Sequence, residues 1–237
     1  MPTAYLVMAV VSIAALTAIF TYRRHRMVAM LGWIGWLLIS AYFLVEYVVI
    51  LNVAAPYDFF HQPMSDLGVT VCGEDAYLLT TNDICSPYHL LINWSFALSG
   101  IATIAGALGL RTWWPAGKKV DIALWLLVVH GLSNIAAGLV PADVDFWLHT
   151  LGSIPGMVVQ IPALLLLGLA IRKSKPLLAW WTFICWVGTT GALILLFYQP
   201  EWMSLPGGLL QRVLYATVYL WMGAVALTIW KQQRFSA

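Results

Sequence analysis

TAYLVMAVVSIAALTAIFTYRRHR, residues 3–26, joins the apolar run 3–21 to a basic turn that holds Arg23, Arg24 and Arg26. A helix needs roughly 20 apolar residues to cross about 30 Å of membrane hydrocarbon, and this run has that length. A cleavable secretory signal carries its positive charge before the apolar stretch, whereas here the charge follows it. We therefore expect an uncleaved first transmembrane helix whose start faces outward.

Apolar runs of similar length recur along the rest of the chain, at 29–51, 88–110, 120–140, 149–171, 177–197 and 207–230. Of the 237 residues, 62% are hydrophobic and 9% are charged. Soluble domains average about 45–50% apolar and about 25% charged residues, so this composition is typical of a protein dissolved in lipid. The sequence predicts one all-α, polytopic membrane domain over residues 1–237, with seven transmembrane helices.

The basic residues set the expected orientation of these helices. They gather after the first, third, fifth and seventh runs, as Arg23/Arg24/Arg26, Arg111/Lys118/Lys119, Arg172/Lys173/Lys175 and Lys231/Arg234. Short cytoplasmic loops collect Lys and Arg, which predicts an outside N-terminus and a cytosolic C-terminus. We interpret the clusters as anchors on anionic membrane lipids rather than as a nucleic-acid site, and expect a multi-pass protein of a bacterial inner membrane.

Residues 52–87 form the one long loop, on the predicted outer side, and it holds two of the three cysteines. An oxidising exterior favours a disulfide between Cys72 and Cys85, which stabilises the fold by about 3 kcal/mol on chain-entropy grounds. Two cysteines are too few for a closed zinc site. Cys185 lies inside the run 177–197, where we expect it to be a small apolar filler.

Polar side chains concentrate toward the outer end of the predicted helices. Residues three or four apart share a helix face, which pairs His89 with Asn93 and His130 with Asn134. Charged groups inside a membrane are costly and are functional candidates by default. We expect a polar pocket open to the outside, with these substrate-binding residues: Glu46, Asn93, His130, Asn134 and Arg212. The alternative is that these groups, including a Glu46–Arg212 ion pair, only join helices.

The motif Ser65-Asp66-Leu67-Gly68 lies in the long loop. It is followed by Asn93 and Gly100, and then by Gly138, Pro141-Ala142-Asp143 and His149. In this order and spacing, residues 30–172 resemble uncharacterised bacterial and archaeal multi-spanning membrane proteins marked by a Ser-Asp-Leu-Gly motif in the first outer loop. The resemblance favours these residues as site candidates: Ser65, Asp66, Asn93, Asp143 and His149. It implies no particular reaction.

Asp66, Asp143 and His149 have oxygen and nitrogen donors that suit a divalent metal such as zinc. A catalytic zinc site uses three protein ligands and a water, whose pKa the metal lowers toward 7. We expect Asp66, His149 and His61 as metal ligands, with His130 as a substitute. The pattern is loosely similar to seven-helix lipid amidohydrolases related to alkaline ceramidase, although the run 207–230 lacks their His-x3-His pair.

A metal-free alternative uses the same region of the chain. His149 acts as general base, Asp143 or Asp66 orients it, and Ser65 is the nucleophile. The Gly-x-Ser-x-Gly elbow of other serine hydrolases is missing here. Ser and Asp also favour helix caps, so Ser65-Asp66 could equally be a structural turn.

The leading hypothesis is a membrane-embedded hydrolase or transferase that acts on a lipid-like substrate at the outer face, with Ser65, Asp66, Asp143 and His149 as catalytic residues. The first alternative is a protein that binds or transports a small molecule or ion. The second is an accessory or sensor protein of the membrane. A retinal protein is excluded, because the run 207–230 has no lysine for the Schiff base.

Overall fold

The computed structural model describes residues 3–198 and 204–235, with side chains up to Gln232. The basic side chain of Arg234 therefore lies outside the described residues. The helical elements, in chain order, are α1 (Thr3–Tyr22), α2 (Arg26–Ile39), α3 (Tyr42–Ile50), the 3₁₀ turn η1 (Met64–Gly68), α4 (His89–Gly109), the 3₁₀ turn η2 (Arg111–Trp113), α5 (Lys118–Leu139), α6 (Phe146–Ile171), α7 (Pro176–Phe197) and α8 (Gly207–Phe235).

Within the described residues, six helices are long and apolar enough to cross a membrane, and α2 with α3 makes a bent pair that can form a seventh span. The sequence predicted a single helix over 29–51, whereas the structure bends this run by 42° at a short break. The Ser40 hydroxyl donates to the Leu37 carbonyl at 2.5 Å, a local bond that competes with helix continuation. The structure confirms the prediction of an all-α protein with several helices that can cross a membrane.

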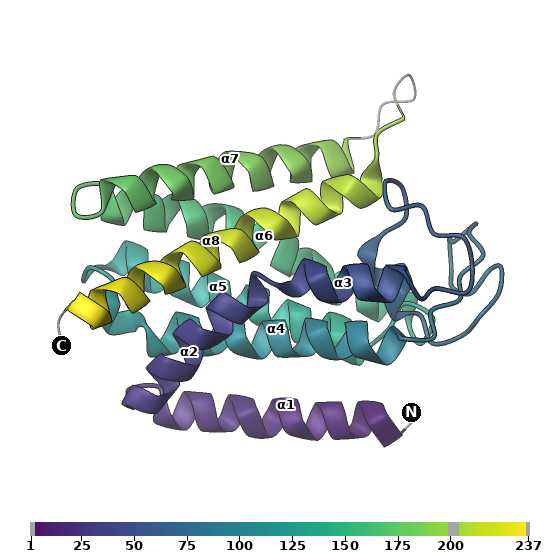
Figure 1. Ribbon diagram of the computed structural model, residues 1–237, viewed down its shortest axis with the longest axis horizontal. Coiled ribbons are helices and arrows are strands. Elements are labelled where there is room, and N and C mark those ends of the chain that lie inside the picture. The colour runs from purple at the N-terminus through teal and green to yellow at the C-terminus, as the bar shows by residue number, and fades with distance from the viewer. Residues whose placement is uncertain (1–2, 199–203, 236–237) are drawn as a thin grey trace.

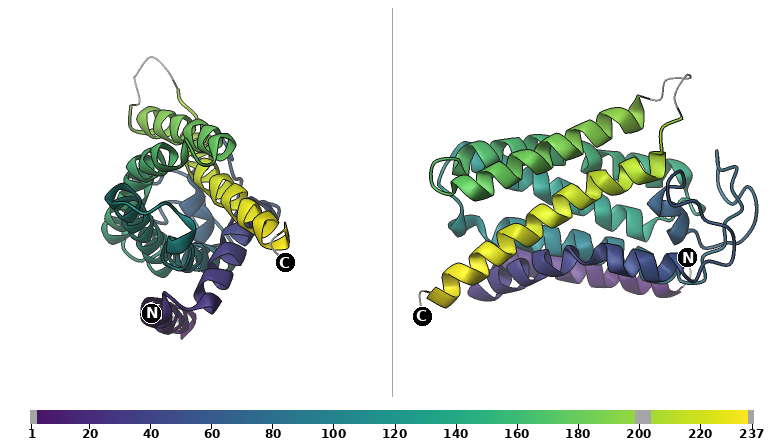
Figure 2. Two further views of the ribbon diagram at one scale, coloured as in Figure 1. Left: turned by 90° about the vertical axis from the view of Figure 1, so that its left-hand side faces the viewer. Right: turned by 45° about the horizontal axis from the view of Figure 1, so that its top comes forward.

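The helices run along the long axis of the molecule, with α1 and α7 on opposite sides and α4 and α5 between them (Figure 1; Figure 2). The α4 helix packs against α1, α2, α3 and α5. The α1–α2 turn, the α4–α5 connection, the α6–α7 turn and the C-terminus all lie at one end, here called the basic end (Figure 1). The loop 52–87 and the N-terminus lie at the other end, here called the loop end.

Glycines bring the central helices into backbone contact. A Cβ atom on Gly100 of α4 would lie 2.3 Å from the carbonyl oxygen of Gly131 on α5, and a Cβ on Gly131 would lie 2.6 Å from the Gly100 oxygen. Gly138 of α5 is equally close to α4, since its Cβ would lie 2.4 Å from the Asn93 oxygen. Small residues at such crossings let helices approach closely, which replaces the missing hydrophobic driving force in lipid.

Within the loop 52–87, the predicted disulfide joins Cys72 to Cys85. Beside it, Gly73 and Ile84 exchange backbone hydrogen bonds of 2.9 and 3.1 Å in an isolated antiparallel bridge. The Ala54 N–H also donates to the Cys85 carbonyl at 2.9 Å, which ties the disulfide to the start of the loop. Cys185 is a free thiol buried in the core, as expected of an apolar filler.

Replacing Gly100 by alanine should force α4 and α5 apart and lower the free energy of unfolding by about 1–3 kcal/mol. The matched control is Gly191→Ala in α7, because a Cβ there meets no atom within 4 Å. Thermal unfolding of both variants in detergent measures the difference. Equal melting temperatures for the two variants would contradict the close crossing.

The basic end should face the cytosol, because Lys and Arg are retained on that side of the membrane. A membrane-impermeant maleimide should label Val144→Cys, at the loop end, in intact cells. It should label Ser174→Cys, in the α6–α7 turn, only after permeabilisation. The native cysteines do not interfere, because two form a disulfide and the third is buried. The reverse pattern of labelling would invert the orientation.

Candidate functional site

The Ser-Asp-Leu-Gly motif forms the 3₁₀ turn η1 and is seated on α4. The Leu67 side chain is fully buried, and its carbonyl accepts a hydrogen bond from the Ser86 hydroxyl at 2.7 Å. Asn93 donates through Nδ2 to the Gly68 carbonyl at 2.7 Å and to the Tyr5 hydroxyl at 2.8 Å. A Cβ on Gly68 would lie 2.4 Å from Asn93 Oδ1. Gly68 and Asn93 therefore hold η1 against α4 and α1.

Asp66 points under the loop and not toward His149. Its carboxylate accepts from the Tyr77 hydroxyl at 2.6 Å and from Gln62 Nε2 at 3.3 Å. Burial raises the pKa of Asp66 to about 6, against the opposing effect of these hydrogen bonds and of the Arg212 charge. Burial and the neighbouring Asp66 carboxylate also raise the pKa of Tyr77. Asp66 thus fastens the loop onto its own motif.

Asp143 joins the segment after the motif to the α5–α6 connection. Its Oδ2 accepts from the Thr70 N–H at 3.1 Å and from the Thr70 hydroxyl at 2.5 Å. Its carboxylate is also near enough to His149 for an electrostatic interaction. Within the described residues the His149 ring hydrogen-bonds to the Val140 carbonyl and not to Asp143. Two of the predicted site residues, Asp143 and His149, therefore interact electrostatically and share no hydrogen bond.

A cavity of about 270 Å³ lies beneath η1, between α5, α6, α7 and α8. Its polar lining residues are Ser65 from η1, Asn134 from α5, His149, Thr150 and Ser153 from α6, and Gln211 and Tyr215 from α8. The rest of the wall is apolar and includes Phe96, Ile154, Met157 and Phe197. The structure therefore brings Ser65 and His149 to one cavity, although they lie far apart in the sequence.

Two hydrogen bonds fix which polar atoms can meet a ligand in this cavity. His149 Nδ1 lies 2.7 Å from the Val140 carbonyl, which can only accept, so Nδ1 carries the hydrogen and Nε2 carries a lone pair. Gln211 Oε1 accepts from the Met64 N–H at 2.7 Å, so the Gln211 NH₂ group remains as a donor. The cavity thus combines a hydroxyl, a base and a donor.

Glu46 and Arg212, predicted to bind substrate, form the ion pair that the sequence offered as the alternative, at 2.9 Å, with both side chains at most 3% exposed. Arg212 Nη1 also donates to the carbonyls of Phe59, Gln62 and Gly208 at 2.8, 3.0 and 3.0 Å. Its Nη2 contacts the Tyr57 hydroxyl. The pair joins α3 to α8 and fastens the start of the loop above them, which is a structural role.

His130 and Asn134 also meet as the helical spacing predicted. Asn134 Nδ2 is 3.4 Å from His130 Nε2 and 3.3 Å from the Tyr219 hydroxyl. His130 is fully buried, and its Nδ1 lies 2.9 Å from the Gly156 carbonyl. Only Asn134 of this pair lines the cavity, so His130 supports the cavity wall from behind.

The predicted metal ligands Asp66, His149 and His61 lie in three different surroundings. His61 Nδ1 is 2.7 Å from Asp58 Oδ2, and both side chains are 53% exposed on the loop. Hydrogen bonds from Tyr77 and Gln62 occupy Asp66, and His149 lines the cavity. In the part of the chain that the structure describes, no three His, Cys, Asp or Glu residues could hold one metal ion. The three predicted ligands therefore do not form one metal site.

The sequence did not single out Gln211, Thr70 or Tyr77 as part of this region. Gln211 directly precedes Arg212 in the same polar turn of α8, and the sequence-based prediction gave weight to the charged residue instead. Thr70 stands two residues after Gly68 and its partner Asp143 lies in a distant connection, so no local spacing reveals the contact.

The fold is that of a polytopic membrane protein, with six apolar spans and a bent pair of helices among the described residues. Its candidate site is the polar cavity beneath the loop at one end. The chain belongs to the family whose model is described as "Protein of unknown function (DUF998)", which matches residues 40–228. This match confirms the predicted membership in an uncharacterised family of multi-spanning proteins. Neither the curated proteins nor the solved structures contain a match.

The raised pKa of Asp66 predicts a pH-dependent stability. Because the pKa is about 6 in the folded protein against an ordinary 3.8, the folded state binds this proton more tightly than the unfolded chain. The resulting stabilisation is complete below about pH 4 and is lost as the pH rises through 6. We expect the free energy of unfolding to fall by about 3 kcal/mol across this window.

Unfolding in detergent between pH 4 and pH 7.5 measures this change, and Asp66→Asn should remove it. Asp58→Asn is the control, because hydrogen bonds from His61 and Phe60 lower the pKa of that exposed carboxyl and shift its titration below the window. A pH dependence that survives in Asp66→Asn would mean that another group is responsible.

Proposed function

We propose that the protein is a membrane-embedded hydrolase or transferase that acts on a lipid-like substrate at the loop end of the bundle. One observation carries the proposal: Ser65 and His149 line the same cavity of about 270 Å³. A hydroxyl and a neutral imidazole with a free lone pair, when both face one cavity, are the minimal set for nucleophilic catalysis.

In the proposed reaction, His149 Nε2 accepts the proton of the Ser65 hydroxyl while Oγ forms a bond to a substrate carbonyl carbon. The carbonyl electrons move to the oxygen, which the Gln211 NH₂ group stabilises as a hydrogen-bond donor. The leaving group takes the proton from His149 and departs, leaving an acyl ester on Ser65. Water then releases the acid in a hydrolase, or a second hydroxyl accepts the acyl group in a transferase.

Asp143 and Asp66 serve this reaction as positioning residues. The Asp143 charge lies beside His149 and favours the imidazolium that forms when the ring takes a proton. Asp66 and Asn93 hold η1, and with it Ser65, through Tyr77, Gln62 and the Gly68 carbonyl. Glu46 and Arg212 hold the preceding segment of the loop.

The lipid-like nature of the substrate follows from the cavity wall and its surroundings. An apolar chain fits against Phe96, Ile154 and Met157, while its polar end meets Ser65, His149 and Gln211. Because Lys and Arg mark the cytosolic side, we propose that the loop end faces outward from a bacterial inner membrane. The substrate is then taken from the outer leaflet.

A small-molecule binding protein is the second candidate function. Asn134, Ser153 and Tyr215 add fixed polar groups to the cavity, which suit recognition as well as catalysis. In that case the same residues hold a ligand without forming a bond to it.

A fluorophosphonate probe, which reacts with activated serines, tests the enzyme directly on the purified full chain. We expect labelling of Ser65, its loss in Ser65→Ala, and a fall of about 10²-fold or more in labelling rate in His149→Gln. His89→Gln is the matched control, because His89 is also half-buried and its Nδ1 lies 3.1 Å from the Ser86 carbonyl, outside the cavity.

Absence of labelling at Ser65 in folded protein would contradict the serine mechanism, as would equal labelling rates in the two histidine variants. A ligand that raises the melting temperature of wild type but not of Gln211→Ala, without any labelling, would favour the binding protein.

A further inference from the structure

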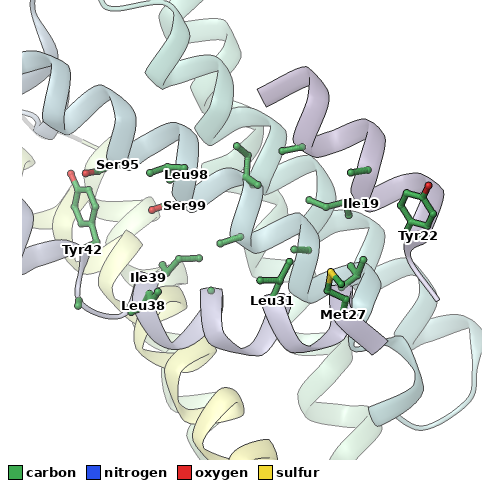
Figure 3. A pocket seen from close by; sticks show the side chains of 18 of the residues that line it. Ile19, Tyr22, Met27, Leu31, Leu38, Ile39, Tyr42, Ser95, Leu98 and Ser99 are labelled. Atoms are coloured by element: carbon green, nitrogen blue, oxygen red, sulfur yellow. The ribbon is translucent and has the colours of Figure 1, made fainter. Parts of the chain in front are cut away.

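A second hollow, which shares no lining residue with the Ser65–His149 cavity, lies on the side of the bundle where α1 and α2 diverge. It is an apolar groove of about 940 Å³ between α1, α2 and α4 (Figure 3). Both helices pack on α4, but α1 makes few contacts with α2 beyond the turn that joins them. The two helices spread apart from that turn (Figure 1).

The groove walls suit hydrocarbon rather than water. They are built by side chains such as Ile19, Leu31, Leu38 and Leu98 (Figure 3), with few polar groups among them. One of these few is Ser95, whose hydroxyl donates a hydrogen bond to the Leu91 carbonyl of its own helix at 2.8 Å. Apolar hollows of this kind exclude water, so within a membrane the groove suits an apolar chain.

The shape of the groove fits one acyl chain. It follows the whole of α2, whose 14 residues extend about 21 Å at 1.5 Å per residue. One leaflet of membrane hydrocarbon is about 15 Å thick, so a single lipid tail can lie along the groove. Tyr22 and Met27 border its basic end, where the α1–α2 turn closes it, and Tyr42 borders the other (Figure 3). A transmembrane helix, about 10 Å wide, would have to continue past that turn.

The positive charge at the closed end of the groove favours a lipid with an anionic headgroup. Arg23, Arg24 and Arg26 occupy the turn between the two walls, and all three are exposed. None of them forms an ion pair with any residue that the structure describes. His25, within the same turn, lines the groove and caps α2 through its Nδ1, which accepts from the Met27 N–H at 3.2 Å. We propose that the groove binds one acyl chain of an anionic phospholipid, whose phosphate is held by these three arginines.

Native mass spectrometry of the delipidated full chain in detergent tests this site. Phosphatidylglycerol and phosphatidylcholine with identical acyl chains are titrated in separate experiments. We expect phosphatidylglycerol to bind at least tenfold more tightly, because each basic residue near a headgroup changes affinity by about fivefold. Equal affinities for the two lipids in wild type would overturn the proposal.

Two pairs of variants distinguish binding of the acyl chain in the groove from binding of the phosphate by the arginines. Ala18→Phe fills the groove and should weaken both lipids at least tenfold, whereas Ala14→Phe, on the exposed surface of the same helix but outside the groove, should not. Arg24→Gln with Arg26→Gln should remove the preference for phosphatidylglycerol. Arg172→Gln with Lys173→Gln, which removes the same charge from the same end, should retain it.

Wild-type lipid affinity in Ala18→Phe would show that the groove holds no acyl chain. A dimer in size-exclusion chromatography that Ala18→Phe dissociates, with lipid binding unchanged, would assign the groove to a second copy of this chain and would also overturn the proposal.

Discussion

The buried ion pair between Glu46 and Arg212 holds together the end of the molecule that carries the candidate site. An isolated charge inside a membrane bundle is costly, so each of these side chains requires the other. Arg212 has more donors than one carboxylate can use, and it directs them to the carbonyls of Phe59 and Gln62. The start of the loop is therefore tied to α8, and the Met64 N–H bond to Gln211 continues that attachment into η1. The position of Ser65 follows from these contacts.

The same physical requirement explains the residues that mark the family resemblance. A non-helical segment at the membrane surface has backbone groups that no helix satisfies, and each needs another partner. The Gly68 carbonyl receives Asn93, the Leu67 carbonyl receives Ser86, and the Thr70 N–H receives Asp143. Gly68 and Gly138 have no side chain because Asn93 occupies that space. Much of the motif therefore builds the seat of η1, and a small remainder, chiefly Ser65 and His149, faces the cavity.

Side-chain direction separated the predicted site residues from one another. Ser65 and Asp66 are consecutive, yet in the 3₁₀ turn one lines the cavity and the other lies under the loop against Tyr77. His61 and Asp58 pair on the loop surface, away from both. The carboxylates and histidines that looked like one metal-ligand set in the sequence are thus divided among three places. Of the two helix-based pairs, His130 and Asn134 meet as their spacing required. His89 instead hydrogen-bonds to the Ser86 carbonyl, and Asn93 donates to Gly68 and Tyr5.

The sequence alone predicted the membrane class, the apolar spans and the disulfide, and it offered the pairing of Glu46 with Arg212 as an alternative to substrate binding. These features follow from hydrophobic length, from the redox state of the exterior and from the cost of an unpaired charge, which need no knowledge of how the helices pack. Tertiary structure decided the 42° bend between α2 and α3, the cavity shared by Ser65 and His149, and the groove beside α1. Each of these depends on where helices distant in the chain cross, and the crossings are set by close glycine contacts such as Gly100 with Gly131, which local spacing does not pair.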